Sequence, residues 1–334
     1  MKNKQVLLAS RPTGAVEESH FSIVETDIPK AADNEFVVRA HYMSLDPYMR
    51  GRMDDAKSYA AKAEVGEVMV GAAVGEVIES RHDKFQVGDF VQTRSGWQQY
   101  GVSDGSGVRK LDANYVPLSA YLGAVGMPGV TAWIGLNEHG KPKAGETVVV
   151  SAASGAVGSA VGQLAKARGA RVVGIAGGAD KCSYVVNELG FDACIDYKKY
   201  PDLKSLSQAL QDACPGGIDG HFENVGSLIL EAVMQRANAF CRVAVCGMIS
   251  GYNGEPIPLT SPQLILVNRM KIEGFIVSEH MEVWPEALKE LGAGVVSGKL
   301  KYRETVAQGI EAAPEAFIGL LKGKNFGKQL VKLV

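Results

Sequence analysis

Residues 147–169 constrain the fold more than any other part of the chain. Residues 148–150 are all valine, as in a strand that is buried on both faces. The small residues 151–155 follow, and residues 156–168 then have the pattern of a helix that ends at Gly169. A strand, a small-residue turn and a helix place the backbone N–H groups of a helix N-terminus where a pyrophosphate can bind.

The glycines of this loop match a dinucleotide-binding fingerprint only in part. The fingerprint requires glycine at positions 153, 155 and 158, whereas this chain has Ala153, Gly155 and Gly158. A tight turn packed against a sheet explains the same residues equally well when they are considered alone.

The segments that follow favour the nucleotide interpretation. A helix is predicted at 181–189, and the sequence predicts further strands at 171–176, 193–196, 218–224 and 242–247. Alternating strands and helices are typical of a parallel sheet with helices on both faces. The loop is therefore predicted to be the first strand-to-helix turn of a Rossmann-type unit.

The length of 334 residues predicts two domains. Residues 1–122 contain short strand-like segments separated by turns, which predict a mostly β barrel for substrate binding and catalysis. Residues 123–297 form the predicted dinucleotide-binding domain. Residues 298–334, which end in an expected strand at 329–334, are predicted to return to the barrel. The predicted fold class is therefore α/β, with a doubly wound parallel sheet and a discontinuous barrel domain.

Composition excludes several classes of protein. The formal net charge of −2 provides no basic surface for nucleic acid. The five cysteines lie between positions 182 and 246 and form no C-x-x-C pair, which argues against a disulfide framework or zinc knuckle and favours a reducing cytoplasm. Residues 147–165 are uncharged but rich in Gly, Ser and Ala, so we do not expect a membrane span there, and the N-terminus shows no signal-peptide pattern.

Five short motifs, together with this domain pattern, resemble the medium-chain dehydrogenase/reductase superfamily. They lie at 46–50 (Asp-Pro-Tyr-Met-Arg), 126–132, 152–159, 223–226 and 246–250. They resemble the zinc-independent branch that contains prostaglandin reductase, plant double-bond reductases and bacterial curcumin reductase, and the resemblance covers nearly the whole chain. It implies a GroES-like barrel domain and a homodimer joined edge to edge near residues 272–277.

Residue types also predict that the protein binds no metal. Zinc-bearing relatives have a cysteine where this chain has Ser44, and a Gly-His-Glu segment where it has Gly71-Ala72-Ala73. The first 181 residues contain no cysteine, so a four-cysteine structural site cannot form there. Without a zinc Lewis acid, alcohol oxidation is disfavoured.

The predicted cofactor is NADPH. No carboxylate ends the strand at 171–176, where an NAD-selective domain usually has one, and Lys181 follows in the next helix. A bound phosphate would explain a lysine in a first turn, although a solvated surface lysine is an equally good explanation from the residues alone. The resemblance implies that Lys181 and Tyr197 hold the adenosine 2′-phosphate.

The resemblance implies further cofactor-binding positions from the loop to the C-terminus: Met127, Thr131, Gly155, Ala156, Val157, Gly177, Asn224, Cys246, Ser250, Phe275, Val277 and Asn325. Two of these have simpler explanations. A single strand cysteine such as Cys246 is usually a small buried apolar residue, and Asn325 stands in a stretch suited to a turn.

The resemblance implies reduction of the C=C bond of α,β-unsaturated ketones or aldehydes, a reaction that requires an oriented substrate and a donor to the developing enolate oxygen. We expect Tyr252 to be that donor and Tyr48 to be a second donor or pocket wall. The structural alternatives are a surface-loop tyrosine for Tyr252 and a tyrosine covering a barrel end for Tyr48. The expected pocket wall favours a bulky apolar or aromatic enone and comprises Tyr48, Met53, Tyr59, Met248, Tyr252 and Phe275. The main alternative is a zinc-free quinone oxidoreductase. A nucleotide-sensing or RNA-binding protein and a purely structural protein are weaker ones.

Overall fold

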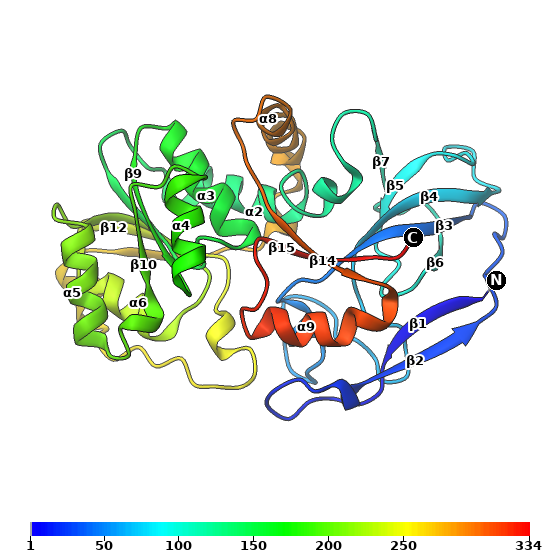
Figure 1. Ribbon diagram of the computed structural model, residues 1–334, viewed down its shortest axis with the longest axis horizontal. Helices are drawn as coiled ribbons and strands as arrows, with labels where there is room; N and C mark the ends of the chain where they lie inside the picture. The colour runs from blue at the N-terminus through cyan, green and yellow to red at the C-terminus, as the bar shows by residue number, and fades with distance from the viewer. Residues whose placement is uncertain (1) are drawn as a thin grey trace. The chain divides into compact units, whose positions relative to one another are not determined.

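The computed structural model describes residues 2–334, which divide into two compact units (Figure 1). The first unit contains the chain up to Gly123 together with Tyr252–Gly254 and Glu304–Val334, and the second contains Ala124–Gly251 and Glu255–Arg303. The return to the first unit begins at Glu304, later than the position 298 expected from the sequence. Within residues 2–334, no helix has both the length and the apolar content that a membrane span requires.

The second unit is built on a six-stranded parallel sheet with the strand order β10-β9-β8-β11-β12-β13. Its strands are β8 (Thr147–Val150), β9 (Arg171–Ala176), β10 (Ala193–Asp196), β11 (Ile218–Glu223), β12 (Ala237–Val245) and β13 (Lys271–Gly274). The Rossmann-type sheet predicted from the sequence is confirmed. β12 begins well before the predicted position 242, because a register shift lets Ile218 pair with Ala237.

Helices precede, connect and follow these strands. They are α2 (Met127–Ile134), α3 (Ala156–Ala167), α4 (Ala179–Asn187), α5 (Leu203–Ala213), α6 (Ser227–Met234), α7 (Gln263–Val267) and α8 (Trp284–Val296). α5 and α6 pack on one face of the sheet, where their apolar residues share a core with Val149, Val173 and Ile195. α3 packs closely against Phe191, which lies just before β10. A Cβ on Gly162 of this helix would lie 1.8 Å from Cζ of Phe191. Only glycine allows this helix position.

The first unit is mostly β structure, as predicted. Its main sheet has the order β14-β15-β3-β4-β5-β7, and β6 also pairs with β3. The strands of this unit are β1 (Asn3–Leu8), β2 (Phe21–Thr26), β3 (Phe36–Ser44), β4 (Ala73–Ser80), β5 (Phe90–Thr93), β6 (Tyr100–Ser103), β7 (Arg109–Leu111), β14 (Glu304–Gln308) and β15 (Lys328–Lys332), and the helices are α1 (Met49–Arg52) and α9 (Ala313–Leu321). β15 pairs antiparallel with β3 and so joins the two ends of the chain in one sheet.

Aromatic and methionine side chains fill the core of the first unit. The ring of Trp97 stacks on Phe21 at a centroid distance of 5.4 Å and meets Phe317 edge to face at 5.5 Å. Met49 and Met53 are completely buried in the same cluster. The expectation that Met53 lines a substrate pocket is therefore wrong, because its side chain fills the core.

Candidate cofactor and catalytic site

The predicted cofactor-binding residues of the second unit follow the carboxyl ends of its strands. Gly177 follows β9, Asn224 follows β11, Cys246 follows β12 and Phe275 follows β13, and Ser151, which was not predicted, follows β8. Parallel strands have their carboxyl ends at one edge of the sheet, so these positions share that edge. The chain runs outward from β8 through β9 to β10 and then crosses to β11 on the other side of β8. Such a reversal of strand order is where parallel sheets of this type bind ligands.

The loop after β8 keeps the close packing that its fingerprint requires, although Ala153 replaces the first glycine. Gly174 of β9 makes room for Ala153, since a Cβ on Gly174 would lie 2.8 Å from the Ala153 Cβ. A Cβ on Gly158 would lie 2.4 Å from the carbonyl oxygen of Ala152, which itself has a positive φ of 48°. The alanine is thus compensated by a glycine on the neighbouring strand.

The N-terminus of α3 presents backbone donors at this edge. Gly155 is the N-cap residue and accepts the first helical hydrogen bond from Ser159 N at 3.0 Å. The N–H groups of Ala156 and Val157 lie in the first turn, which contains no acidic side chain. First-turn N–H groups have no partner within the helix and carry its positive dipole end, so they suit a pyrophosphate.

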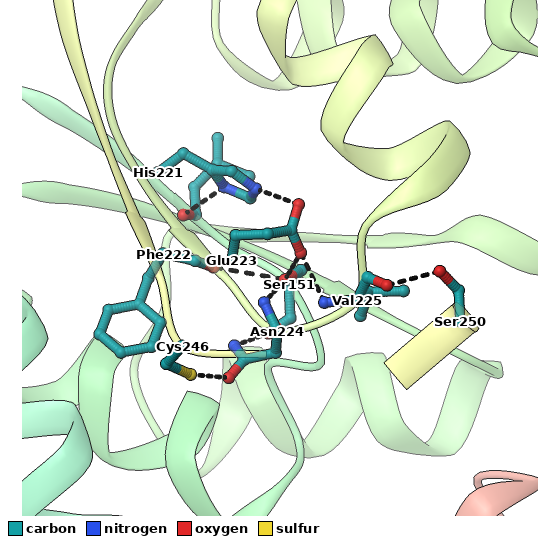
Figure 2. A network of polar contacts seen from close by, with 9 residues as sticks. Ser151, His221, Phe222, Glu223, Asn224, Val225, Cys246 and Ser250 are labelled. Carbon is teal, nitrogen blue, oxygen red and sulfur yellow. Dashed lines mark hydrogen bonds and ion pairs between the residues drawn. The ribbon is translucent and has the colours of Figure 1, made fainter. Parts of the chain in front are cut away.

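A buried pair of ionisable side chains lies behind this loop (Figure 2). His221 Nε2 is 2.9 Å from Glu223 Oε2, and His221 Nδ1 is 3.0 Å from the carbonyl oxygen of Val149. Glu223 Oε1 accepts hydrogen bonds from Ser151 Oγ at 2.7 Å and from Val225 N at 2.6 Å. Burial by itself raises the pKa of Glu223, but the His221 charge and these hydrogen bonds outweigh it, so the net shift is downward. Glu223 is therefore held as a carboxylate.

This pair orients Asn224 through Ser151. The Asn224 backbone N–H donates to Ser151 Oγ at 2.7 Å, and Asn224 Nδ2 donates to the Ser151 carbonyl at 2.7 Å. The Cys246 thiol donates to Asn224 Oδ1 at 2.9 Å, as Figure 2 shows. Burial, and then the nearby Glu223, raises the pKa of Cys246, which keeps the thiol protonated as a donor. The Asn224 amide therefore has a single orientation, with one Nδ2 proton left for a ligand.

Ser250 completes the network. Its hydroxyl donates to the carbonyl oxygen of Val225 at 2.6 Å, and its backbone N–H donates to the same oxygen at 3.1 Å. The simpler explanation for Cys246, a small buried apolar residue, does not account for its hydrogen bond to Asn224. Neither His221 nor Ser151 was identified from the sequence, because a polar residue within an apolar strand gives no indication of its partners.

A second group of residues lies at the carboxyl ends of β9 and β10. A Cβ on Gly177 would lie 2.9 Å from Cε1 of Tyr197 and 3.1 Å from Cε of Lys198, so only glycine lets these two side chains pack against the end of β9. We call this group of side chains the cradle. Asp196 Oδ1 accepts a hydrogen bond from Gly178 N at 2.8 Å and holds the two strand ends together.

Two lysines meet at this cradle. Burial, and then the positive charge of Lys198, lowers the pKa of Lys181. Like charges placed together in this way are typical of an anion site, because a bound phosphate removes their repulsion. Lys198 was not among the predicted residues. The sequence signal was its position directly after Tyr197 at the end of a strand.

The remaining predicted cofactor residues lie in α2, after β13 and, for Asn325, in the first unit. Thr131 Oγ1 donates to the Met127 carbonyl at 2.8 Å, so these two residues of α2 lie together. The ring of Phe275 is buried and stacks on His139 at a centroid distance of 4.7 Å, which leaves mainly its backbone for a ligand. Val277 accepts a hydrogen bond from Trp284 Nε1 at 3.1 Å through its carbonyl.

Asn325 belongs to the first unit, where its Nδ2 donates to Gly327 O at 2.7 Å across a turn.

Both predicted catalytic tyrosines belong to the first unit. Burial, and then the neighbouring Asp46, raises the pKa of Tyr48, so its phenol stays protonated. Tyr252 is half-buried, and the residue after it is held by Arg50, whose Nε donates to Asn253 Oδ1 at 3.2 Å. Arg50 is itself buried and donates to Asp54 and to the Gly14 carbonyl. Sequence reasoning noted Arg50 as a motif residue and missed this anchoring contact.

Ser44, which stands where zinc-bearing relatives have a cysteine, takes part in a buried ionic cluster. Its hydroxyl donates to Asp46, and Lys328 Nζ donates to Asp46 Oδ1 at 2.8 Å and to the Leu45 carbonyl at 2.6 Å. Among residues 2–334, no group of three or more His, Cys, Asp or Glu side chains is arranged to hold a metal ion. Lys328 thus supplies the positive charge beside Asp46.

The sequence is similar to those of known oxidoreductases. Residues 4–111 match the family described as the N-terminal domain of oxidoreductase, and residues 156–293 match the family described as zinc-binding dehydrogenase. The chain is 43% identical to the NADPH-dependent curcumin reductase of Escherichia coli, with 99% of this chain and 97% of that protein covered. It is 42% identical to the NADP(+)-dependent 2-alkenal reductase of Nicotiana tabacum, with the same coverage.

A solved structure extends the comparison to three dimensions. The crystal structure of CurA from Vibrio vulnificus in complex with NADPH superposes with a TM-score of 0.94 at 45% identity, over 99% of both chains. Sequence and fold thus agree over nearly the whole length. The chain belongs to the zinc-independent branch of the medium-chain dehydrogenase/reductase superfamily, together with the curcumin, prostaglandin and 2-alkenal reductases.

Proposed function

We propose that this protein is an NADPH-dependent reductase of the C=C bond of α,β-unsaturated ketones and aldehydes. The observation that carries the proposal is the arrangement at one sheet edge of a pyrophosphate loop, an oriented amide and a two-lysine cradle. The relatives named as NADPH-dependent curcumin reductase and 2-alkenal reductase support the same reaction class at more than 40% identity.

The residues of the second unit fit NADPH in three parts. The N–H groups of Ala156 and Val157 bind the pyrophosphate. Lys181, Tyr197 and Lys198 hold the 2′-phosphate, because Tyr197 and Lys198 pack against Gly177 at the end of β9 and the repulsion between the two lysines favours an anion. Asn224, fixed by Ser151 and Cys246, binds the nicotinamide half.

Bound NADPH supplies the hydride for the β-carbon of the substrate. The protein orients the enone and stabilises the negative charge that develops on its carbonyl oxygen. We assign this donor role to the Tyr252 hydroxyl, because the following residue is anchored by the buried Arg50. Tyr48, whose raised pKa keeps it protonated, is a second donor or a wall of the substrate site. The proposal includes no metal ion.

The expected substrate is a bulky apolar or aromatic enone. Tyr48 and Tyr252 of the first unit supply aromatic surface, and Tyr59 is 61% exposed and so accessible to a ligand. The similarity to the curcumin reductase of Escherichia coli supports an aromatic enone.

The test is to follow reduced-nicotinamide absorbance with an aryl enone and to identify the product by mass spectrometry. NADPH and NADH are compared, and a simple quinone is run in parallel. We expect consumption with the enone, faster with NADPH than with NADH, and a product saturated at the former C=C bond. Consumption with the quinone alone would favour a quinone oxidoreductase instead.

We also propose a homodimer that forms at the β13 edge in the cytoplasm. β13 is the terminal strand of its sheet, so its outer backbone groups are available to a second copy. Leu266 and Val267, just before it in the chain, are 80% and 61% exposed, and Phe240 N donates to Asn268 O beside them. Sedimentation should give a dimer for the wild type, and Ile272→Pro should give a monomer that still binds NADPH. A monomeric wild type would contradict the proposal.

A further inference from the structure

Two cysteines of the second unit lie in contact at the edge of the sheet. Cys182 is in the first turns of α4, Cys194 is in β10, and the Cys194 thiol donates to the Cys182 sulfur at 2.8 Å. Both residues are partly exposed. They are separated by twelve positions in sequence, so the contact is a tertiary one.

The other three cysteines have different surroundings. Cys214 and Cys241 are 2% and 0% exposed, and the thiol of Cys246 is occupied by Asn224. Peroxide and other small oxidants react with accessible thiolates, so the buried thiols are protected. Cys182 and Cys194 are the accessible pair.

The contact makes the two sulfurs chemically unequal. The hydrogen bond from Cys194 lowers the pKa of Cys182 in spite of its burial. The same hydrogen bond, and then burial, raises the pKa of Cys194. Cys182 is therefore the more acidic thiol, which suits it to attack an oxidant first, with Cys194 as the resolving thiol.

The pair adjoins the cradle assigned to the 2′-phosphate. Cys182 directly follows Lys181 in α4, and Cys194 lies two residues before Asp196, which holds Gly178. Tyr197 and Lys198 follow Asp196 in the chain. A covalent bond between the sulfurs would thus tie together the two elements that carry the phosphate ligands.

We propose that Cys182 and Cys194 form a peroxide-sensitive dithiol site, whose oxidation to a disulfide weakens binding of the 2′-phosphorylated dinucleotide at Lys181. The two sulfurs are 2.8 Å apart, and a disulfide brings them to about 2.0 Å, so α4 next to Lys181 must move relative to β10 when the bond forms. By linkage, bound NADPH opposes disulfide formation. The effect on cofactor affinity rests on the proposed function, whereas the disulfide chemistry does not.

The oxidation balances with one molecule of hydrogen peroxide. The Cys182 thiolate attacks the peroxide, the O–O bond breaks, and a sulfenic acid and water form once a proton is taken up. The Cys194 sulfur then attacks the sulfenic sulfur, its proton leaves with the hydroxyl group as water, and the S–S bond forms. Two electrons pass from the two sulfurs to the peroxide.

The experiment treats the full-length protein with hydrogen peroxide and measures three quantities: titratable thiols after unfolding, disulfide-linked peptides by mass spectrometry, and Kd for NADPH and for NADH. We expect the titratable thiols to fall from the five of the sequence to three, with a Cys182–Cys194 linked peptide. Kd for NADPH should rise about fivefold, at the lower end of typical coupling between sites. Kd for NADH should not change, and a thiol reductant should reverse the effect.

Variants separate the steps. Cys194→Ser should accumulate a Cys182 sulfenic acid that dimedone traps, with no linked peptide, and Cys182→Ser should show neither species. Cys214→Ala, the matched control, should behave like the wild type.

Three outcomes distinguish the parts of the proposal. Absence of the linked peptide from oxidised wild type would overturn it. A linked peptide with equal NADPH affinity before and after oxidation would overturn the coupling. A reduced protein that does not bind NADPH would instead refute the proposed function, and the peptide analysis would then judge the dithiol site alone.

Discussion

Nε2 of His221 lies 2.9 Å from Oε2 of Glu223, and neither side chain is exposed to solvent. Two ionisable groups buried together stabilise a fold only when both are present, since a lone buried charge has lost its water without gaining a partner. Here the pair also supports Ser151, which in turn orients Asn224. The stability of the sheet core and the geometry of the proposed nicotinamide site are thus linked through one carboxylate.

Removing one member of this pair should destabilise the protein more than removing both. We expect Glu223→Leu to lower the free energy of unfolding by about 3–5 kcal/mol, because it leaves His221 buried without its partner. The double variant His221→Leu/Glu223→Leu should lose less than the sum of the two single variants. Urea unfolding of the wild type, the two single variants and the double variant measures these free energies. Additive losses of unfolding free energy would show that the two residues are not coupled.

Acid should weaken the fold through the same carboxylate. The pKa of Glu223 is lowered in the folded protein, so its contribution to stability is complete above its unfolded pKa of about 4.3 and is lost as the pH falls through the folded pKa. In the variant Glu223→Gln, the amide side chain at position 223 cannot titrate. The free energy of unfolding of this variant should therefore fall less steeply than that of the wild type below about pH 4. If the free energy of unfolding falls with equal slope against pH in both proteins, the acid sensitivity belongs to other groups.

The two lysines at the phosphate cradle should determine the preference for NADPH. We expect Lys181→Ala and Lys198→Ala each to raise Kd for NADPH about 10- to 100-fold, the range for losing a hydrogen bond to a charged group. Kd for NADH should hardly change, because NADH has no 2′-phosphate. Lys204→Ala, an exposed lysine in α5, is the control. Equal losses for both dinucleotides would indicate a structural role for the lysines instead.

Tyr252 should act on turnover and not on cofactor binding. Tyr252→Phe removes the hydroxyl proposed to stabilise the developing oxyanion, and we expect kcat to fall about 100-fold with Kd for NADPH unchanged. Tyr115→Phe, an exposed tyrosine of the same unit, should retain wild-type kcat. Unchanged turnover in Tyr252→Phe would remove this tyrosine from the mechanism.

Local patterns in the sequence predicted the part of the site that lies on consecutive residues. The strand, loop and helix around Gly155, and the strands 171–176 and 193–196, were confirmed because burial and helix ends leave a signature in neighbouring residues. The resemblance to a known family then indicated the positions of Lys181, Tyr197 and Asn224. Met53 shows the limit of this approach, because motif position suggested a pocket wall where the structure has a core residue.

Contacts between distant residues required the tertiary structure. Lys328 contacts Asp46, which is 282 positions away in the sequence, and Arg50 contacts Asn253, which is 203 positions away. Cys194 of β10 contacts Cys182 of α4. Ser151 and Glu223 come together only because β8 and β11 are neighbours in the sheet. Hydrophobic periodicity determines which face of a strand or helix is buried, but it does not determine which polar partner another element brings there. The sequence alone therefore determined the type of fold and the cofactor loop, whereas the packing of the strands decided which side chains orient the site.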